Sequence, residues 1–212
     1  MNHSDIAEDK AGLGVIIPAA GVSARMGRPK LLLPWGETTV VGRLIGQWRE
    51  LGAAQVGIVC RAEDAGLAAE LDRLGFPAGD RIINPQPERG MFSSIQCAAQ
   101  WAGWRRELGV WAIALGDQPH LRTETLRRLI EFQREHPLKI CQPEYEGKAA
   151  HPVLLPAWAR AELSAVAGGT LKDFLKLFAG RIVQCPVNDP GLRLDMDTPE
   201  DYKRVQSLMS GT

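Results

Sequence analysis

Residues 18–30 read Pro18-Ala-Ala-Gly21-Val-Ser23-Ala-Arg25-Met-Gly27-Arg-Pro-Lys30, directly after the apolar run Gly14-Val-Ile-Ile17. The apolar run predicts a buried strand, and the glycines after it predict a loop whose backbone can approach a ligand closely. Exposed backbone amides and several cations within one short loop suit a ligand that carries more than one phosphate. The segment therefore predicts a polyphosphate-binding loop at the end of the first strand.

This loop differs from the commonest phosphate-binding patterns. Neither G-x-x-x-x-G-K-[ST] nor G-x-G-x-x-G follows the first strand. Gly12 and Gly14 lie before or at the start of the expected strand rather than after it, where they cannot form a fingerprint turn. The sequence thus disfavours P-loop NTPases and dinucleotide-binding dehydrogenases.

Composition limits the class of protein. The 212 residues carry a formal net charge of zero with 24% charged residues, which disfavours general binding of nucleic acid. No apolar run approaches the roughly 20 residues that a membrane helix needs. The four cysteines are widely separated and form no C-x-x-C, so they predict buried thiols in a cytoplasmic protein. We expect a mobile tail at 1–12 and a single domain at 13–212.

Strand and helix patterns alternate along the chain. Strands are predicted at 14–17, 56–60, 81–84, 110–115, 138–142, 152–155 and 182–185, and helices at 40–51, 62–74, 95–102, 123–134 and from 199. The alternation predicts a three-layer α/β/α sandwich around a Rossmann-like, mostly parallel sheet. The strands at 138–142 and 152–155 are too close for a helical crossover, which predicts an antiparallel element late in the chain.

Three aspartates are candidates for chemistry. Ligands of parallel sheets bind beyond the carboxyl ends of the strands, and Asp117 follows the strand at 110–115. A carboxylate there suits Mg²⁺ whose other ligands are phosphates, although a turn aspartate before proline is the structural alternative. Asp195 and Asp197 precede a helix that begins at Pro199, and they are candidates to complete the metal site.

The motifs together resemble one family. The segment at 19–30 matches A-A-G-x-S-x-R-M-G-x-x-K of the molybdenum cofactor cytidylyltransferase-like nucleotidyltransferases at every fixed position. The family's D-Q-P, G-M-x-x-S and D-x-D-T-P-E-D patterns recur at 117–119, 90–94 and 195–201, and H-P-V recurs at 151–153. The resemblance extends from about residue 14 to residue 202.

The resemblance implies Mg²⁺-dependent transfer of CMP from CTP to phosphorylated molybdopterin, with release of pyrophosphate. It implies catalytic roles for Arg25, Lys30 and Asp117, acceptor contacts from Gln118 and His151, and metal ligation by Asp117, Asp195 and Asp197. It also implies transient contact with a molybdoenzyme or its chaperone. Expected nucleotide contacts are Ala19, Ala20, Gly21, Ser23, Arg25, Lys30, Asn84, Gly90 and Ser94. For Ser94 and His151 the structural alternatives, a helix cap and a core histidine, remain equally open.

Departures from the family pattern leave alternatives. The G-D-x-G-x-R stretch expected after H-P-V is absent, and Gly168-Gly-Thr170-Leu-Lys172-Asp173 stands in that part of the chain. One alternative is a cytidylyltransferase for another acceptor, such as methylerythritol phosphate. Another is a non-catalytic nucleotide sensor or cofactor chaperone, which would not need to retain the carboxylates of a metal site. The preference for CTP over GTP follows from the family resemblance at Ala19-Ala20.

Overall fold

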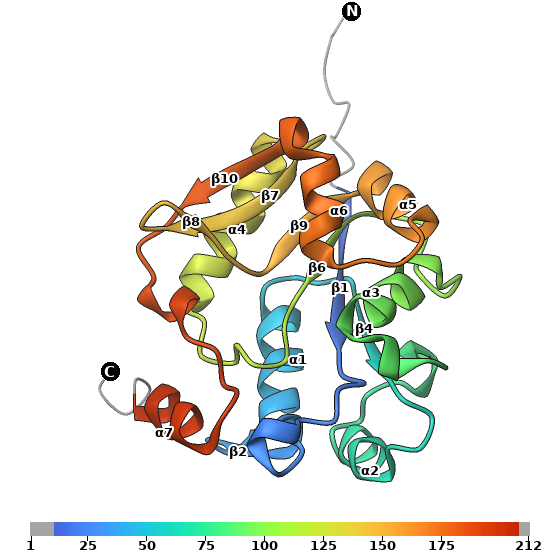
Figure 1. The fold of residues 1–212 in the computed structure, drawn as a ribbon, viewed down its shortest axis with the longest axis vertical. Coiled ribbons are helices and arrows are strands. Elements are labelled where there is room, and N and C mark those ends of the chain that lie inside the picture. The colour runs from blue at the N-terminus through green and yellow to red at the C-terminus, as the bar shows by residue number, and fades with distance from the viewer. Residues whose placement is uncertain (1–10, 208–212) are drawn as a thin grey trace, which may run out of the picture.

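A mixed sheet forms the centre of the computed structural model, which describes residues 11–207 (Figure 1). Its strand order is β10-β7-β9-β6-β1-β4-β5, with β8 paired to β7. The strands of this sheet are β1 (Gly12–Pro18), β4 (Gln55–Cys60), β5 (Arg81–Ile83), β6 (Leu108–Ile113), β7 (Ile140–Tyr145), β8 (Lys148–Ala149), β9 (Val153–Pro156) and β10 (Ile182–Pro186). β2 (Pro34–Trp35) and β3 (Thr38–Thr39) form a separate antiparallel pair. β1 pairs in parallel with both β4 and β6, whereas β9 runs antiparallel to β6 and β7. The mostly parallel sheet and its late antiparallel element are thus confirmed.

Helices cover both faces of this sheet. Along β1, Val15 and Ile17 pack into one apolar cluster while Ile16 packs into another, as the period of two in a strand requires. The first face carries α1 (Val40–Glu50), α2 (Ala65–Arg73), α4 (Thr123–Glu135) and α7 (Pro199–Ser207). The opposite face carries α3 (Met91–Gln100), α5 (Ala157–Ala165) and α6 (Leu171–Leu177). The three-layer sandwich is confirmed.

The predicted start of the first strand needs correction. β1 begins at Gly12, so Gly12 and Gly14 lie inside the strand rather than before it. Gly14 is required there, because a Cβ would meet Trp111 Cδ1 at 2.9 Å. A tight hairpin joins β7 to β8, and its two central residues, Glu146 and Gly147, both have positive φ. The predicted tail, apart from its last two residues, lies outside the described residues.

The cysteines are unpaired thiols. Cys60, Cys141 and Cys185 are buried and Cys97 is half-buried, in agreement with the prediction of structural thiols. Burial raises the pKa of Cys60 to about 11, which keeps its thiol protonated and unreactive at neutral pH. Within residues 11–207, the helices are all too short or too polar to cross a membrane.

Candidate active site

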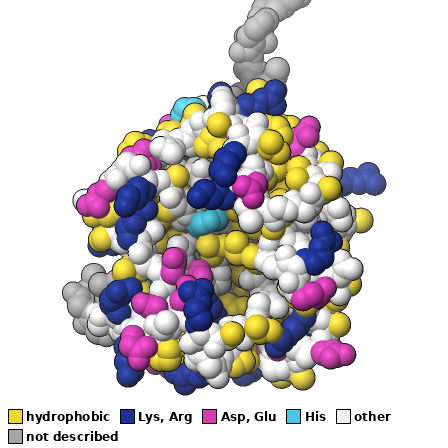
Figure 2. Space-filling model, in the orientation of Figure 1, with side chains coloured by type: hydrophobic (Ala, Val, Ile, Leu, Met, Phe, Trp, Pro, Cys, Tyr) yellow, Lys and Arg dark blue, Asp and Glu magenta, His cyan; other side chains and the backbone are white. Residues whose placement is uncertain are grey.

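A cavity of about 380 Å³ opens at the carboxyl ends of β1 and β6. Figure 2 shows the hollow on this face, with acidic and basic side chains gathered along one side of it. The cavity is lined by Pro18, Ala19, Ala20, Gly21, Ser23, Ala24, Arg25, Lys30, Leu31, Pro87, Gly90, Met91, Ser94, Leu115, Gly116, Asp117 and Asp197. The structure therefore brings the 18–30 loop, the turn before α3 and the 115–117 turn to one place.

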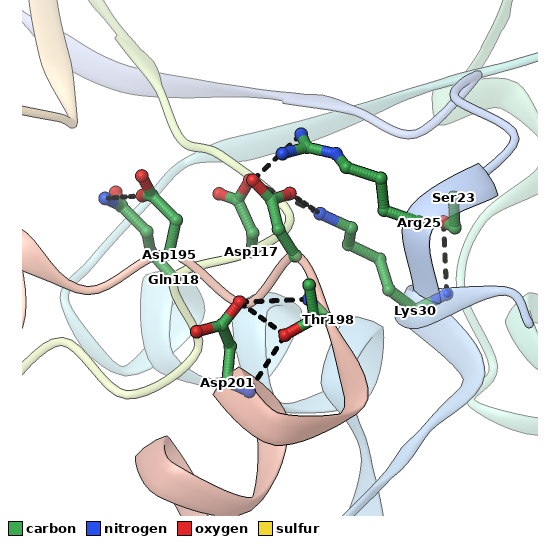
Figure 3. A network of polar contacts seen from close by, with 9 residues as sticks. Ser23, Arg25, Lys30, Asp117, Gln118, Asp195, Thr198 and Asp201 are labelled. Carbon is green, nitrogen blue, oxygen red and sulfur yellow. Dashed lines mark hydrogen bonds and ion pairs between the residues drawn. The ribbon is translucent and has the colours of Figure 1, made fainter. Parts of the chain in front are cut away.

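The 18–30 loop folds back on itself to present its cations. Ser23 and Gly27 have φ values of 50° and 69°, and they flank the 3₁₀ turn η1 (Ala24–Met26). The Oγ atom of Ser23 accepts a hydrogen bond from the backbone N–H of Lys30 at 3.2 Å, which closes the loop. The side chains of Arg25 and Lys30 consequently point toward the same group of carboxylates (Figure 3).

Lys30 links two carboxylates that are far apart in the sequence. Its Nζ lies 3.4 Å from Asp117 Oδ2 and 3.0 Å from Asp197 Oδ1. Arg25 Nη2 lies 2.9 Å from Asp197 Oδ2. Lys30 is only 17% exposed at its side chain whereas Arg25 is 73% exposed, so solvent screens the Arg25 pair far more strongly. Lys30 is therefore the principal cation of this network.

Asp117 has an unusual electrostatic environment. Burial raises the pKa of its carboxyl above the ordinary value of 3.8, Lys30 lowers it, and the nearby Asp195 and Asp197 raise it further. Its Oδ1 atom is buried and lacks a hydrogen-bond partner among the described residues. An unpaired buried carboxylate oxygen is costly, so this atom is available to a cation or a donor from a ligand.

The predicted three-carboxylate metal site is not preformed. Among residues 11–207 there is no group of three acidic, histidine or cysteine side chains arranged to hold an ion. Asp117 and Asp197 converge on Lys30, while Asp195 Oδ1 accepts a hydrogen bond from Gln118 Nε2 at 3.3 Å. The free Oδ1 of Asp117 and the neighbouring Asp197 fit the oxygen ligands that Mg²⁺ prefers. The assignment of metal ligands stays a prediction.

Four predicted site residues do not line the cavity: Asn84, Gln118, His151 and Asp195. Asn84 is 1% exposed and is committed to its neighbours. Its Nδ2 donates to Ser93 Oγ and Ser94 Oγ, at 2.9 and 3.0 Å, and its Oδ1 accepts from the backbone N–H of Gln86 at 2.9 Å. Asn84 thus holds the turn that leads to Gly90 and Met91, and it reaches the cavity only through that turn.

We expect Asn84→Ala to lower the free energy of unfolding by about 2–3 kcal/mol, because it leaves buried hydroxyl and amide groups without partners. Urea unfolding monitored by circular dichroism measures the change. The exposed Asn188→Ala is the matched control and should change stability by less than about 0.5 kcal/mol. Equal stability of the two variants would show that the turn is held by other contacts.

His151 is half-buried and lies two residues before β9, and its Nδ1 atom is buried without a partner among residues 11–207. Burial lowers the pKa of its imidazole from 6.5 to about 4, and Asp195 opposes part of that shift. The folded protein therefore holds His151 neutral over a pH range in which the unfolded chain protonates it. This environment suits a neutral hydrogen-bonding group better than a cation.

We expect acid to destabilise the protein through His151. Because its folded pKa is depressed, the loss begins as pH falls below 6.5 and is complete near 4, and it amounts to at most about 3 kcal/mol. Urea unfolding between pH 7.5 and 4 measures the slope. His151→Gln should flatten it relative to wild type, whereas His120, whose pKa burial also lowers, contributes equally to both proteins. If stability depended on pH equally in wild type and in His151→Gln, His151 would not be the source of the acid destabilisation.

Sequence reasoning missed the apolar part of the cavity. Leu31, Pro87, Met91 and Leu115 line it, and Met91 is 46% exposed. Gly116 also lines the cavity, and a Cβ there would meet Leu31 Cδ2 at 2.9 Å, so the glycine lets Leu31 lie close to the 115–117 turn. The cavity thus combines apolar and charged lining residues, which suits a base joined to phosphates.

Comparison with known proteins agrees with this geometry. The sequence profile of the MobA-like NTP transferase domain matches residues 15–183. The molybdenum cofactor cytidylyltransferase of Escherichia coli K12 is 23% identical over 194 residues, which cover 91% of this chain and 94% of the relative.

Solved structures share the fold. The crystal structure of Rv0371c from Mycobacterium tuberculosis H37Rv is similar with a TM-score of 0.72 and 27% identity, over 93% of this chain and 98% of that one. A crystal structure of Rv0371c in complex with manganese is similar with a TM-score of 0.65 and 23% identity, over 92% and 98% of the two chains.

Proposed function

Because this chain belongs to the MobA-like NTP transferase family, we propose that it transfers CMP from CTP to a phosphorylated small molecule, with molybdopterin as the first candidate acceptor. One observation carries the proposal. Lys30 joins Asp117 and Asp197 in a cavity that is also lined by the apolar side chains of Leu31, Pro87, Met91 and Leu115, so cations, carboxylates and a surface for a base meet in one cavity. We take residues 13–212 to form one nucleotidyltransferase domain.

The chemistry proposed is an in-line displacement at phosphorus. A phosphate oxygen of the acceptor forms a bond to the α-phosphorus of the nucleotide, the bond to the bridging oxygen breaks, and pyrophosphate leaves with its electron pair. Such reactions depend mainly on positioning and charge stabilisation, with little covalent work for the protein. The residues around the cavity are suited to those two tasks.

The 18–30 loop is assigned to the nucleotide. Backbone groups at 19–21 face the base and ribose, and Ser23 keeps the loop closed around the phosphates. Lys30 and Arg25 exchange their carboxylate partners for phosphate oxygens and stabilise the negative charge that develops on pyrophosphate. Gly90 and Ser94 also line the cavity, and Asn84 holds Ser94 through a hydrogen bond from outside it.

The proposed divalent cation is Mg²⁺. Asp117 would hold it through the unpaired Oδ1 together with Asp197, and Asp195 would approach from the acceptor side. When bound, the ion supplies Lewis acidity and charge neutralisation at the phosphates. Asp117 also orients the ammonium group of Lys30, and this task is independent of the ion.

The acceptor is assigned to the side of Gln118 and His151. Gln118 is buried and donates to Asp195, and its Oε1 atom has no partner among the described residues. The neutral imidazole of His151 also offers its Nδ1 atom, which has no partner in the described part of the chain. These groups suit a polar acceptor such as a pterin phosphate. The product would then pass to a molybdoenzyme or its chaperone through a transient contact. The free thiols are in keeping with a cytoplasmic setting.

Release of pyrophosphate tests the proposal. The protein is incubated with Mg²⁺, with CTP or GTP, and with molybdopterin or methylerythritol phosphate in separate reactions. We expect release only with CTP and molybdopterin, and none after EDTA is added. Release with methylerythritol phosphate, and not with molybdopterin, would show that the acceptor is methylerythritol phosphate. Tight Mg²⁺-dependent binding of CTP without any release would instead support a nucleotide sensor or cofactor chaperone.

A further inference from the structure

We propose that Asp189 is a positioning residue that fixes the loop of Asp195 and Asp197 against the loop of Asp117. The inference rests on the proposed function for its catalytic consequence, whereas the contacts themselves do not depend on it. Asp189 lies between β10 and the 3₁₀ turn η6 (Pro190–Arg193) and is 2% exposed. A buried carboxylate outside the cavity requires a reason, because its desolvation is costly without good partners.

Asp189 has partners on two separate segments. Its Oδ1 accepts from the backbone N–H of Gly191 at 2.9 Å, which caps η6. Its Oδ2 accepts from Thr125 Oγ1 at 2.7 Å and from the backbone N–H of Arg122 at 3.3 Å. One carboxylate therefore joins η6 to the first turn of α4.

The start of α4 depends on this contact. Arg122 occupies the N-cap position and makes no side-chain capping hydrogen bond of its own. Free backbone N–H groups at a helix start favour a carboxylate, both as hydrogen-bond acceptor and as a negative charge at the positive end of the helix. Asp189 supplies that carboxylate from a distant part of the chain.

The contact of Asp189 with η6 and with the start of α4 forms a junction between two loops. The loop of Asp117 leads into this junction, and the loop of Asp195 and Asp197 leaves it. The segment 117–121 runs into the start of α4, and Asp195 and Asp197 follow η6. Two further hydrogen bonds join the segment 117–121 directly to the segment 191–196. The imidazole Nε2 of His120 lies 3.0 Å from the carbonyl oxygen of Gly191, and the backbone N–H of Met196 donates to the carbonyl oxygen of Asp117 at 3.2 Å. A displacement at Asp189 is thereby passed to the distance between Asp117 and Asp197.

The junction tolerates little rearrangement. A Cβ placed on Gly191 would meet Asp189 Oδ1 at 2.9 Å and His120 Cδ2 at 3.3 Å, so Asp189 and His120 close tightly on the backbone of η6. Catalytic geometry is sensitive on this scale, since a displacement of about 1 Å caused by a remote substitution can lower a rate about 10²-fold.

Asp189→Asn and Thr125→Val test the proposal without altering side-chain size. Thr125→Val removes the hydroxyl that donates to Oδ2, whereas Asp189→Asn removes the charge and replaces one accepting oxygen with an NH2 group. Thr39→Val is the matched control because it removes the hydroxyl that caps α1, away from the cavity lining. We expect Asp189→Asn to lower kcat about 10–100-fold with the KM for CTP within about threefold of wild type. Thr125→Val should act in the same direction, and the double variant should be no slower than Asp189→Asn alone.

Hydrogen exchange separates this proposal from the proposed function. In Asp189→Asn, exchange at Met196 should accelerate by about tenfold or more, while the amides of β1 exchange as in wild type. That measurement needs no substrate, so it tests the junction even where no pyrophosphate is released. Unchanged exchange at Met196, or a loss of kcat no larger than that of an equally destabilised Thr39→Val, would overturn the positioning role. If Asp189→Asn fails to fold, the same two measurements, exchange at Met196 and kcat, are made on Thr125→Val and judged by the same criteria.

Discussion

Lys30→Ala is expected to lower kcat by about 10²–10³-fold, because it removes the cation aimed at the charge that develops on pyrophosphate. Lys30 is mostly shielded from solvent and contacts both Asp117 and Asp197, so water cannot replace its ammonium group effectively. Pyrophosphate release at saturating CTP measures the effect. Arg25→Ala should cost less, since the Arg25 side chain is 73% exposed.

Lys176→Ala is the matched control for Lys30→Ala. Lys176 also pairs with an aspartate, Asp173, at 3.2 Å, but both side chains are largely exposed on α6. Its removal should leave kcat unchanged and alter stability by less than about 1 kcal/mol. Wild-type turnover by a folded Lys30→Ala protein would show that the assignment of this cation is wrong.

Asp117→Asn is expected to lower kcat by about 10²–10³-fold while keeping the shape of the side chain. The amide loses the negative charge that orients Lys30, and it replaces one carboxylate oxygen available to a divalent cation. Mn²⁺ binding by the free protein should weaken in parallel, which provides a readout independent of turnover. Asp72→Asn removes a 71% exposed carboxylate that pairs with Arg81, and it should affect neither quantity.

The pH dependence of turnover follows from the same residue. Because the pKa of Asp117 is raised above 3.8, mainly by burial, its carboxylate is protonated on acidification earlier than an ordinary aspartate. We therefore expect kcat/KM to have its maximal value at neutral pH and to fall as the pH drops toward this raised pKa. A rate that held constant down to pH 4 would contradict a role for the ionised form.

Much of the fold could be predicted from local sequence. The apolar run at 14–17 and the buried run at 110–115 specify central strands, because strands covered on both faces contain few polar residues. β1 begins two residues before the predicted start, because Gly12 allows the close approach of Leu108 from β6, where a Cβ would meet Leu108 Cδ2 at 3.1 Å. A contact with a distant strand leaves no local pattern.

Local sequence also predicts one part of the candidate site and not the other. The 18–30 loop could be predicted because its glycines, serine and cations are contiguous and follow a strand, so they must gather at one edge of a parallel sheet. The spacing also placed Asp117 at that edge. Asn84 was expected to contact the nucleotide, whereas its side chain is fully used in holding the turn before α3.

The sequence by itself determined the alternation of strands and helices and the presence of a phosphate-type loop, because both depend on residues close together in the chain. Only the tertiary structure decided that Lys30 lies between Asp117 and Asp197, and that Asp189 joins η6 to α4. Those pairings depend on strand order and on which loops meet beyond the sheet. Hydrogen bonds and ion pairs act over a few ångströms in space, and separation along the sequence does not constrain them.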